Sequence, residues 1–224
     1  MFKKILVANR GEIALRIIRA CKEIGIDTVA IYSDVDKLSL HTKFADEAIC
    51  IGPADSSKSY LNIPSILSAA ELTNADAIHP GYGFLSENSD FSTICKDNNL
   101  TFIGPSSDII SVMGDKASAR DTMRKLNIPI IPGSIGIVNN SEEGLEIAKD
   151  LGFPVIIKAS SGGGGRGMRI VNDSQDFKNA FDTAQSEAKI SFNDTNVYIE
   201  KYFISPKHIE IQIISDTHGN VYSL

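Results

Sequence analysis

The chain has 224 residues, of which 42% are hydrophobic and 22% charged, a composition typical of one large or two ordinary globular domains. Its formal net charge of −6 argues against a nucleic-acid-binding surface. No apolar run approaches the roughly 18 residues of a membrane span, and no signal-peptide pattern precedes the first predicted strand. We therefore expect no nucleic-acid partner and no membrane attachment.

The first part of the chain alternates between strand and helix patterns. Strands are predicted at 4–8, 28–32, 47–51, 77–79 and 100–103, and helices at 12–24, 60–72 and 88–98. This alternation predicts parallel βαβ units, and therefore an α/β fold with a doubly wound parallel sheet. Ligands meet such a sheet at the loops that follow its strands.

Unusual residues collect in one of these loops, which reads HPGYGFLSEN from His79 to Asn88. Two glycines flank Tyr82 and would let it project from a tight loop. Glu87 fits either a site acid or a first-turn acid of the next helix, beside Ser86. His79 is most simply a hydrogen-bonded histidine at a strand end.

The three cysteines, Cys21, Cys50 and Cys95, lie in apolar runs without C-x-x-C spacing. This pattern predicts reduced core residues in an intracellular compartment rather than disulfides or metal ligands.

The second half of the chain begins with a helical pattern from 106 to 126, which Gly114 interrupts just before Lys116. An isolated lysine is usually a solvated surface group. The stretch 127–137 holds two prolines and two glycines among apolar residues, which is typical of a domain boundary. Helices are then predicted at 141–151 and 174–188, and strands at 196–202 and 208–214.

A glycine-rich segment lies between two β-rich runs, the first ending at Lys158 and the second beginning at Met168. Its residues are Gly162, Gly163, Gly164, Gly165, Arg166 and Gly167. The backbone N–H groups of such a segment can hold phosphate oxygens, and Lys158 and Arg166 would supply positive charge. A Rossmann fingerprint would open a helix here, and a Walker A loop would end in Gly-Lys-Ser/Thr, so neither fits. The pattern predicts a hairpin flap over a nucleotide, with a surface hairpin that binds no ligand as the alternative.

The strand predicted at 196–202 leads into residues that suit a purine, namely Glu200, Lys201, Tyr202 and Phe203. A strand edge offers backbone N–H and C=O groups, and an apolar ring can cover the face of the base. Taken alone, this is an ordinary strand end. Together with a phosphate flap one hairpin away, it favours a nucleotide site.

Several long motifs stand in a fixed order: KILVANRGEIALRIIRA (4–20), KSYLNIP (58–64), HPGYGFLSEN (79–88), FIGPS (102–106), MGDK (113–116), FPVIIKASSGGGGRGMRIV (153–171) and IEKY…HIEIQI (199–213). With these motifs the chain resembles biotin carboxylase, the ATP-grasp component of biotin-dependent carboxylases, and most of all the stand-alone subunit of acetyl-CoA carboxylase. The resemblance implies a Rossmann-like pre-ATP-grasp domain at 1–113. It also implies an ATP-grasp domain at 114–224 that is incomplete in this chain, with a flap subdomain at about 132–203.

The resemblance implies the activity of an ATP-dependent ligase. In this family ATP phosphorylates bicarbonate, and the carbon dioxide of the resulting carboxyphosphate is transferred to N1 of a biotin held on the biotin carboxyl carrier protein. Two Mg²⁺ or Mn²⁺ ions neutralise the ATP phosphates. In acetyl-CoA carboxylase this is the first step of malonyl-CoA formation in fatty acid biosynthesis, with carboxyltransferase subunits as further partners. The full-length proteins are often homodimers.

Site residues are implied by position in the motifs. The ATP-binding residues would be Lys116, Lys158, the segment from Gly162 to Gly167, Glu200, Lys201, Tyr202, Phe203 and His208. In this assignment the lysines contact the phosphates and the glycine-rich segment forms a lid over them. Tyr82 and Gly83 would face biotin, with Glu87 near the site. The family's metal-binding glutamates, bicarbonate-binding arginine and proposed base lie downstream of Leu224, so we expect no catalytic or metal-binding residue within this chain.

We therefore expect that this chain alone does not carboxylate biotin. One alternative is the first part of a multidomain pyruvate, acyl-CoA or urea carboxylase, and another is a nucleotide-binding module without catalysis. An unrelated ATP-grasp ligase would explain the flap but not the GYGFLSEN motif. A start at Met1 without a leader favours the stand-alone form, in the cytoplasm of a bacterium or in the plastid stroma if the gene is plastid-encoded.

Overall fold

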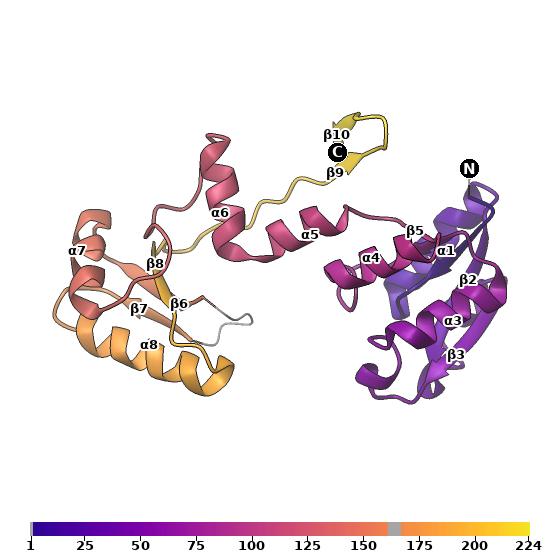
Figure 1. Cartoon of the computed structure of the whole chain (residues 1–224), viewed down its shortest axis with the longest axis horizontal. Helices are drawn as coiled ribbons and strands as arrows, with labels where there is room; N and C mark the ends of the chain where they lie inside the picture. Colours follow the sequence, from indigo (N-terminus) through magenta and orange to yellow (C-terminus); the bar gives the residue numbers. More distant parts are fainter. Residues whose placement is uncertain (1, 161–166) are drawn as a thin grey trace. The chain divides into compact units, whose positions relative to one another are not determined.

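The computed structural model describes residues 2–160 and 167–224, so the predicted lid residues from Gly162 to Arg166 lie outside the described part. The chain divides into two compact units, Met1–Ala119 and Arg120–Leu224 (Figure 1). Each unit has a sheet and an apolar core of its own. The domain division expected at 113/114 remains a prediction.

The first unit is built on a five-stranded sheet in the order β3-β2-β1-β4-β5, and all neighbouring strands are parallel. Its strands are β1 (Lys4–Val7), β2 (Asp27–Ser33), β3 (Glu47–Gly52), β4 (Ala77–His79) and β5 (Thr101–Phe102).

Alternate residues of β1 point to opposite faces of the sheet, and both sets are buried and apolar. Helices therefore cover both faces. Leu6 packs with Ile66 of α3 (Ile63–Thr73) and Phe91 of α4 (Ser89–Asp97). Val7 packs instead with Ile18 of α1 (Gly11–Glu23). The predicted α/β class with a doubly wound parallel sheet is confirmed.

Helix α3 begins three residues later than predicted, for a local reason. The Asn62 side chain accepts a hydrogen bond of 3.1 Å from the Ser65 N–H, which makes Asn62 the N-cap, and Pro64 occupies the first turn. The short elements η1 (Asp34–Asp36), α2 (Leu40–Phe44) and η2 (Ser56–Lys58) were not predicted because they are too short to show a period. The predicted break near Gly114 separates α5 (Ser107–Gly114) from α6 (Lys116–Lys125).

The prediction of three core cysteines is wrong for one of them. Cys21 and Cys95 are buried, whereas Cys50 is exposed. Cys50 lies on β3, which is an edge strand of the sheet and is mostly exposed along its length. Burial raises the pKa of the Cys21 thiol, and it raises that of Cys95 to about 11.

The second unit contains an antiparallel sheet in the order β7-β6-β8, formed by β6 (Val155–Ala159), β7 (Met168–Val171) and β8 (Val197–Lys201). The predicted hairpin is confirmed, with Lys158 opposite Met168. Helices α7 (Ser141–Leu151) and α8 (Phe177–Phe192) share a core with the sheet (Figure 1). On β6 and β8 the core residues are Val155, Ile157, Val197 and Ile199, which leaves the alternate residues on the opposite face.

The stretch 127–137 is not a free linker between domains. Gly133 and Val138 pair with β8 on its outer side, and the Ser134 N–H donates to the Ile199 carbonyl at 2.8 Å. A Cβ at Gly133 would lie 2.5 Å from that same carbonyl oxygen, so only glycine fits there. We call residues 131–134 the β8 strap.

The end of the chain differs from the predicted strand at 208–214. A short hairpin forms from β9 (Ile213–Ser215) and β10 (Val221–Ser223), and all residues from 203 to 224 are exposed. Helix α8 begins at Phe177 and ends at Phe192, beyond the predicted end at 188. Its C-cap is Asn193, which adopts the left-handed conformation. Among the described residues, no helix is both long enough and apolar enough to cross a membrane.

The burial pattern predicts one fast-reacting thiol. In the native chain at pH 8 we expect Cys50 to react with a chromogenic disulfide at least roughly tenfold faster than the other two thiols, because those are buried. The measurement is the time course of thiol release, with all three thiols titrated in denaturant as the reference. A Cys50→Ser variant that kept the fast phase would contradict this.

Candidate functional site

Glu200 is a buried acid on the face of the β7-β6-β8 sheet that is turned away from the α7 and α8 core. Lys158 and Glu200 occupy diagonal positions on neighbouring strands, because Ile156 pairs with Glu200 and Lys158 pairs with Tyr198. The Lys158 Nζ donates to the Glu200 Oε2 at 2.5 Å. The Glu200 side chain is 7% exposed and that of Lys158 is 26% exposed. The two predicted site residues are therefore brought together, but as an ion pair.

Arg120 of α6 supplies a second cation to the same carboxylate. Its Nη1 donates to the Glu200 Oε1, and its Nη2 donates to the Ile131 carbonyl at 2.9 Å. The sequence offered no signal for this contact, because an arginine on a polar helix reads as a solvated side chain and its partner lies 80 residues further along. Glu200 is thus bonded through both oxygens.

Tyr198 shares this face of the sheet. Burial, with a contribution from the nearby Glu200 carboxylate, raises the pKa of Tyr198 to about 12. The phenol therefore stays neutral at physiological pH. The charged groups of this cluster are then Lys158, Arg120 and Glu200.

The end of β8 offers fewer groups to a ligand than the sequence suggested. The Lys201 Nζ donates to the carbonyls of Gly152 and Phe153, at 2.8 and 3.1 Å, so this side chain holds the chain after α7. The N–H groups of Lys201 and Tyr202 donate to the carbonyls of Pro132 and Pro154. The strand edge predicted for a purine is thus already bonded to the protein at these two donors.

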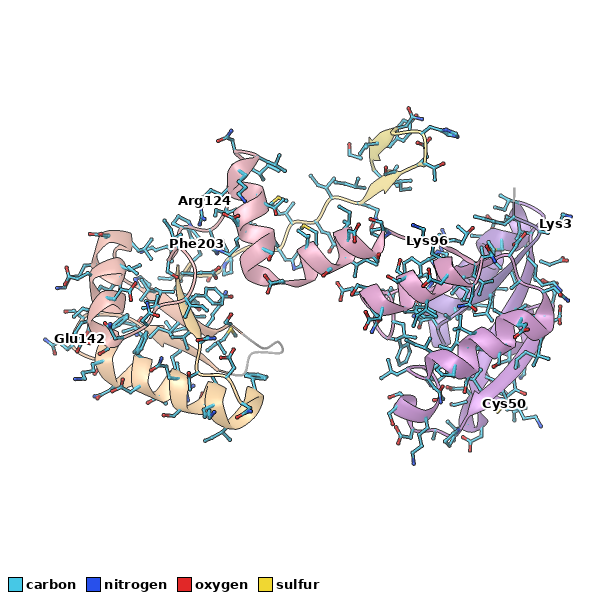
Figure 2. All side chains as sticks on the ribbon, in the orientation of Figure 1. Lys3, Cys50, Lys96, Arg124, Glu142 and Phe203 are labelled. Carbon is cyan, nitrogen blue, oxygen red and sulfur yellow. The ribbon has the colours of Figure 1, made fainter. Side chains whose placement is uncertain are left out.

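Phe203, labelled in Figure 2, is the first residue beyond these bonds. The residue is 49% exposed. His208 is 85% exposed, and its Nε2 lies 3.4 Å from the Glu210 Oε2 in its own segment. Among the described residues, no hydrogen bond joins His208 to Lys158 or Glu200. Phe203 therefore presents an exposed side chain at the strand end, whereas His208 lies outside the cluster.

Two further predicted residues lie at the edges of the described part. Lys116 begins α6, and its side chain is outside the described atoms. Gly167 closes the β6–β7 hairpin, where its carbonyl accepts from the Ala159 N–H at 2.9 Å. Its φ of +67° is in the left-handed region, and a Cβ there would lie 3.0 Å from the Ala159 Cβ.

In the first unit, Asn9 fixes the loop that carries Tyr82. The Asn9 Nδ2 donates to the carbonyls of Pro80 and Tyr82, at 2.7 and 2.8 Å, and the residue is 3% exposed. Gly81 and Gly83 have φ values of +65° and +67°, as the flanking glycines predicted. Tyr82 is 60% exposed and its hydroxyl donates to Glu12. A pocket of about 380 Å³ opens beside this loop, lined by Asn9, Arg10, Gly11, Glu12, Ile13, Tyr82, Gly83 and Phe84.

A second buried acid, Asp36, is bonded to Arg10, which lines this pocket. Asp36 is 5% exposed and receives two hydrogen bonds from Arg10, at 2.6 and 2.7 Å, and one from the Tyr60 hydroxyl at 2.7 Å. The Arg10 guanidinium, with help from Tyr60, holds the pKa of the Asp36 carboxyl well below its usual range. The Tyr60 ring stacks on Phe84 with the ring centroids 5.1 Å apart. None of this network was predicted from the sequence.

Glu87 and His79 occupy ordinary positions. Glu87 is exposed in the turn before α4, and Asn88 is the N-cap of that helix, accepting from the Phe91 N–H at 2.7 Å. The alternative role of Glu87 as a first-turn acid is therefore wrong, because Asp90 occupies the first turn. His79 Nδ1 accepts from the Gly81 N–H at 3.1 Å, and burial lowers the pKa of His79.

Comparison with known proteins accounts for nearly the whole chain. The family model for the biotin carboxylase N-terminal domain matches residues 1–110, and that for the ATP-binding domain of the carbamoyl-phosphate synthase L chain matches residues 115–224. Biotin carboxylase of Nostoc sp. is 57% identical over 223 residues, which are 100% of this chain and 50% of that protein.

The chain belongs to the biotin carboxylase family. It spans about half the length of the curated relatives that it matches. The structure of a Campylobacter jejuni biotin carboxylase–beta-gamma-ATP complex is 51% identical, with a TM-score of 0.90 over 100% of this chain and 50% of that one. A 2-oxoglutarate carboxylase biotin carboxylase domain dimer from Hydrogenobacter thermophilus, in complex with MgADP, ADP and bicarbonate, is 48% identical, with a TM-score of 0.87 over 100% of this chain and 49% of that one.

Family membership confirms the predicted class of the second unit, a partial ATP-grasp region after the Rossmann-like sheet. In this chain the structure brings together Lys158 with Glu200, and Tyr82 with Gly83. The Lys201 side chain, in contrast, is bonded to the carbonyls of Gly152 and Phe153. Among the described residues, no group of three or more His, Cys, Asp or Glu side chains could hold a metal ion.

The Asp36 network predicts a pH-dependent contribution to stability. Because the folded-state pKa of Asp36 is lowered from 3.8, its contribution is present above about pH 4 and is lost as the pH falls toward the folded-state pKa. We expect Asp36→Asn to cost about 2–3 kcal/mol of unfolding free energy at pH 7, with the gap to wild type narrowing below pH 4.

The measurement is urea unfolding of both proteins from pH 7 to pH 3. Asp34→Asn, at an exposed acid in the same short helix, is the matched control and should change stability by less than about 0.5 kcal/mol. A gap between wild type and Asp36→Asn that stays constant over this range would disprove the assignment.

Proposed function

We propose that the whole protein to which this chain corresponds is a biotin carboxylase, an ATP-dependent ligase that carboxylates biotin at the expense of ATP and bicarbonate. This chain would contain part of the nucleotide-binding site and some of the residues that face biotin. The family match supports the reaction class, and the Campylobacter and Hydrogenobacter structures, with a nucleotide and with bicarbonate, support the ligands.

One observation carries the nucleotide assignment. On the sheet face away from the α7 and α8 core, Lys158 is the next-to-last residue of β6, and the glycine-rich segment begins four residues later, at Gly162. Its side chain is partly exposed, whereas the side chain of Glu200, to which it is bonded, is buried. A polyphosphate beside this strand end would find a positioned cation, and backbone N–H groups of a glycine-rich turn are suited to the remaining oxygens.

The adenine would lie at the end of β8. Phe203 is exposed, and its backbone N–H is the first in the Lys201–Phe203 run that is not bonded to another described residue. In the first unit, Tyr82 and Gly83 would face biotin, and Asn9 would keep their loop in place. The assignments of Lys116, Glu87, His208 and the glycine-rich segment remain part of this proposal.

ATP chemistry of this kind uses Mg²⁺ or Mn²⁺ to neutralise the phosphates. The described residues do not fit such a site, because no acidic cluster with the required number of ligands is present among them. We therefore assign the metal ligands to the part of the relatives' length that this chain does not cover. The bicarbonate-binding arginine and the base belong there as well.

We further propose that the protein acts with a biotin carboxyl carrier protein and carboxyltransferase subunits, as a homodimer, in the first step of malonyl-CoA formation for fatty acid synthesis. The bacterial cytoplasm or the plastid stroma is the proposed location. A multidomain carboxylase is the second candidate, because the 2-oxoglutarate carboxylase domain matches almost as well as the Campylobacter protein. Identifying a covalently attached biotinyl domain in the same polypeptide would decide for this candidate.

The nucleotide assignment is tested by calorimetric titration of the chain with MgATP. We expect Lys158→Ala to weaken binding at least tenfold, about 1.4 kcal/mol, because it removes the phosphate-facing cation. Lys149→Ala, which removes an exposed lysine of α7 in the same unit, is the control and should bind like wild type. Equal binding by Lys158→Ala would contradict the assignment, and no binding by wild type would mean that the site needs the rest of the protein.

The division of the catalytic groups gives a further prediction. We expect the 224-residue chain to show no phosphate release from ATP that depends on both bicarbonate and free biotin, because the expected metal ligands and base lie outside it. The assay compares phosphate release with and without each substrate. Turnover stimulated by both substrates would show that the catalytic groups are already present here.

A further inference from the structure

The buried carboxylate of Glu200 creates a problem for any model in which Lys158 serves a ligand. Both Glu200 oxygens are bonded to a cation, and the side chain is 7% exposed. The Lys158 ammonium has three N–H donors, but a phosphate that draws it away from Glu200 would lengthen or break the bond between them. A buried carboxylate left without a counter-ion is strongly destabilising, so this exchange would oppose ligand binding.

We propose that Arg120 is a positioning residue that keeps Glu200 neutralised while Lys158 turns from Glu200 to the polyphosphate of a nucleotide. The proposal rests on the nucleotide site proposed above and adds a residue to it. It assigns different tasks to the two cations of one carboxylate. Arg120 is the permanent partner and Lys158 is the exchangeable one.

The geometry favours Arg120 for the permanent task. Its side chain is 18% exposed, against 26% for Lys158. It is fixed at two points, by Glu200 and by the Ile131 carbonyl of the β8 strap. A planar guanidinium keeps its charge and its orientation in such a contact, whereas a lysine ammonium on a flexible stem redirects easily.

The strap leaves room for this arginine. A Cβ at Gly133 would lie 2.9 Å from the Arg120 Nη2 and 3.2 Å from the Glu200 Cγ. A side chain at that position would therefore displace the arginine from the carboxylate. The Ile199 carbonyl already requires a glycine at this position, and the same glycine leaves free the space that the Arg120–Glu200 contact occupies.

The charge balance points the same way. Two cations and one carboxylate leave the cluster with a net charge of +1, and Tyr198 adds none because it is neutral at physiological pH. Without Arg120 the net charge would be zero. Lys158 would then be fully compensated by Glu200 and would attract a polyphosphate weakly.

The test is MgATP titration of the full 224-residue chain with Arg120→Met and its matched control Arg124→Met, an exposed arginine on the same helix (Figure 2). We expect Arg120→Met to bind at least tenfold more weakly than wild type and Arg124→Met to bind within twofold of it. Arg120→Lys keeps a cation beside Glu200 but loses the planar two-point contact, so its affinity should lie between those of wild type and Arg120→Met.

A role limited to folding is separated from this proposal by the partner acid. With Glu200→Gln there is no buried charge to neutralise, so adding Arg120→Met to Glu200→Gln should change the affinity less than twofold.

Equal affinities of Arg120→Met and Arg124→Met would overturn the inference and leave the nucleotide site standing. A loss in the double variant as large as in Arg120→Met alone would also overturn it, because the effect would then be independent of Glu200. If neither wild type nor Arg124→Met binds MgATP, this chain alone does not form the nucleotide site, and the role inferred for Arg120 within this chain fails as well. Should Arg120→Met not fold, the Glu200→Gln pair and Arg120→Lys still decide the question.

Discussion

A carboxylate buried on a sheet face must be neutralised where it lies, and Glu200 imposes this requirement on the second unit. Its oxygens are bonded by Lys158 from β6 and by Arg120 from α6, which lie 42 and 80 residues away along the chain. Arg120 also holds the β8 strap through Ile131. One side chain thus joins a hairpin, an edge strand and a helix that no local sequence preference would bring together.

The first unit solves a similar problem with different donors. Asp36 is neutralised by Arg10 and also accepts a hydrogen bond from the hydroxyl of Tyr60, whose ring stacks on Phe84. Phe84 belongs to the loop of Tyr82, so the Asp36 network is connected to that loop through the stacked rings. Asn9 holds the same loop by donating to the Tyr82 carbonyl. In both units a buried charge therefore lies directly behind the residues proposed to meet a ligand.

The sequence predicted most element types because their hydrophobic periods are long and regular, as in α1 and α7. It also identified Lys158, Glu200 and Tyr82 as unusual from their residue types and neighbours. It could not predict Arg120 or Asp36 as partners, since those contacts depend on how distant segments pack. The direction of the Lys201 side chain could have been foreseen, because successive residues of a strand point to opposite faces and Glu200 and Lys201 are adjacent.

The bonds of the Lys201 ammonium to the carbonyls after α7 affect how experiments on this strand end are interpreted. Replacing Lys201 would release the end of α7 and shift Pro154, which in turn holds the Tyr202 N–H. A weaker affinity measured for such a variant would report a displaced backbone. It would be a false positive in any mutational map that equates lost affinity with a lost ligand contact.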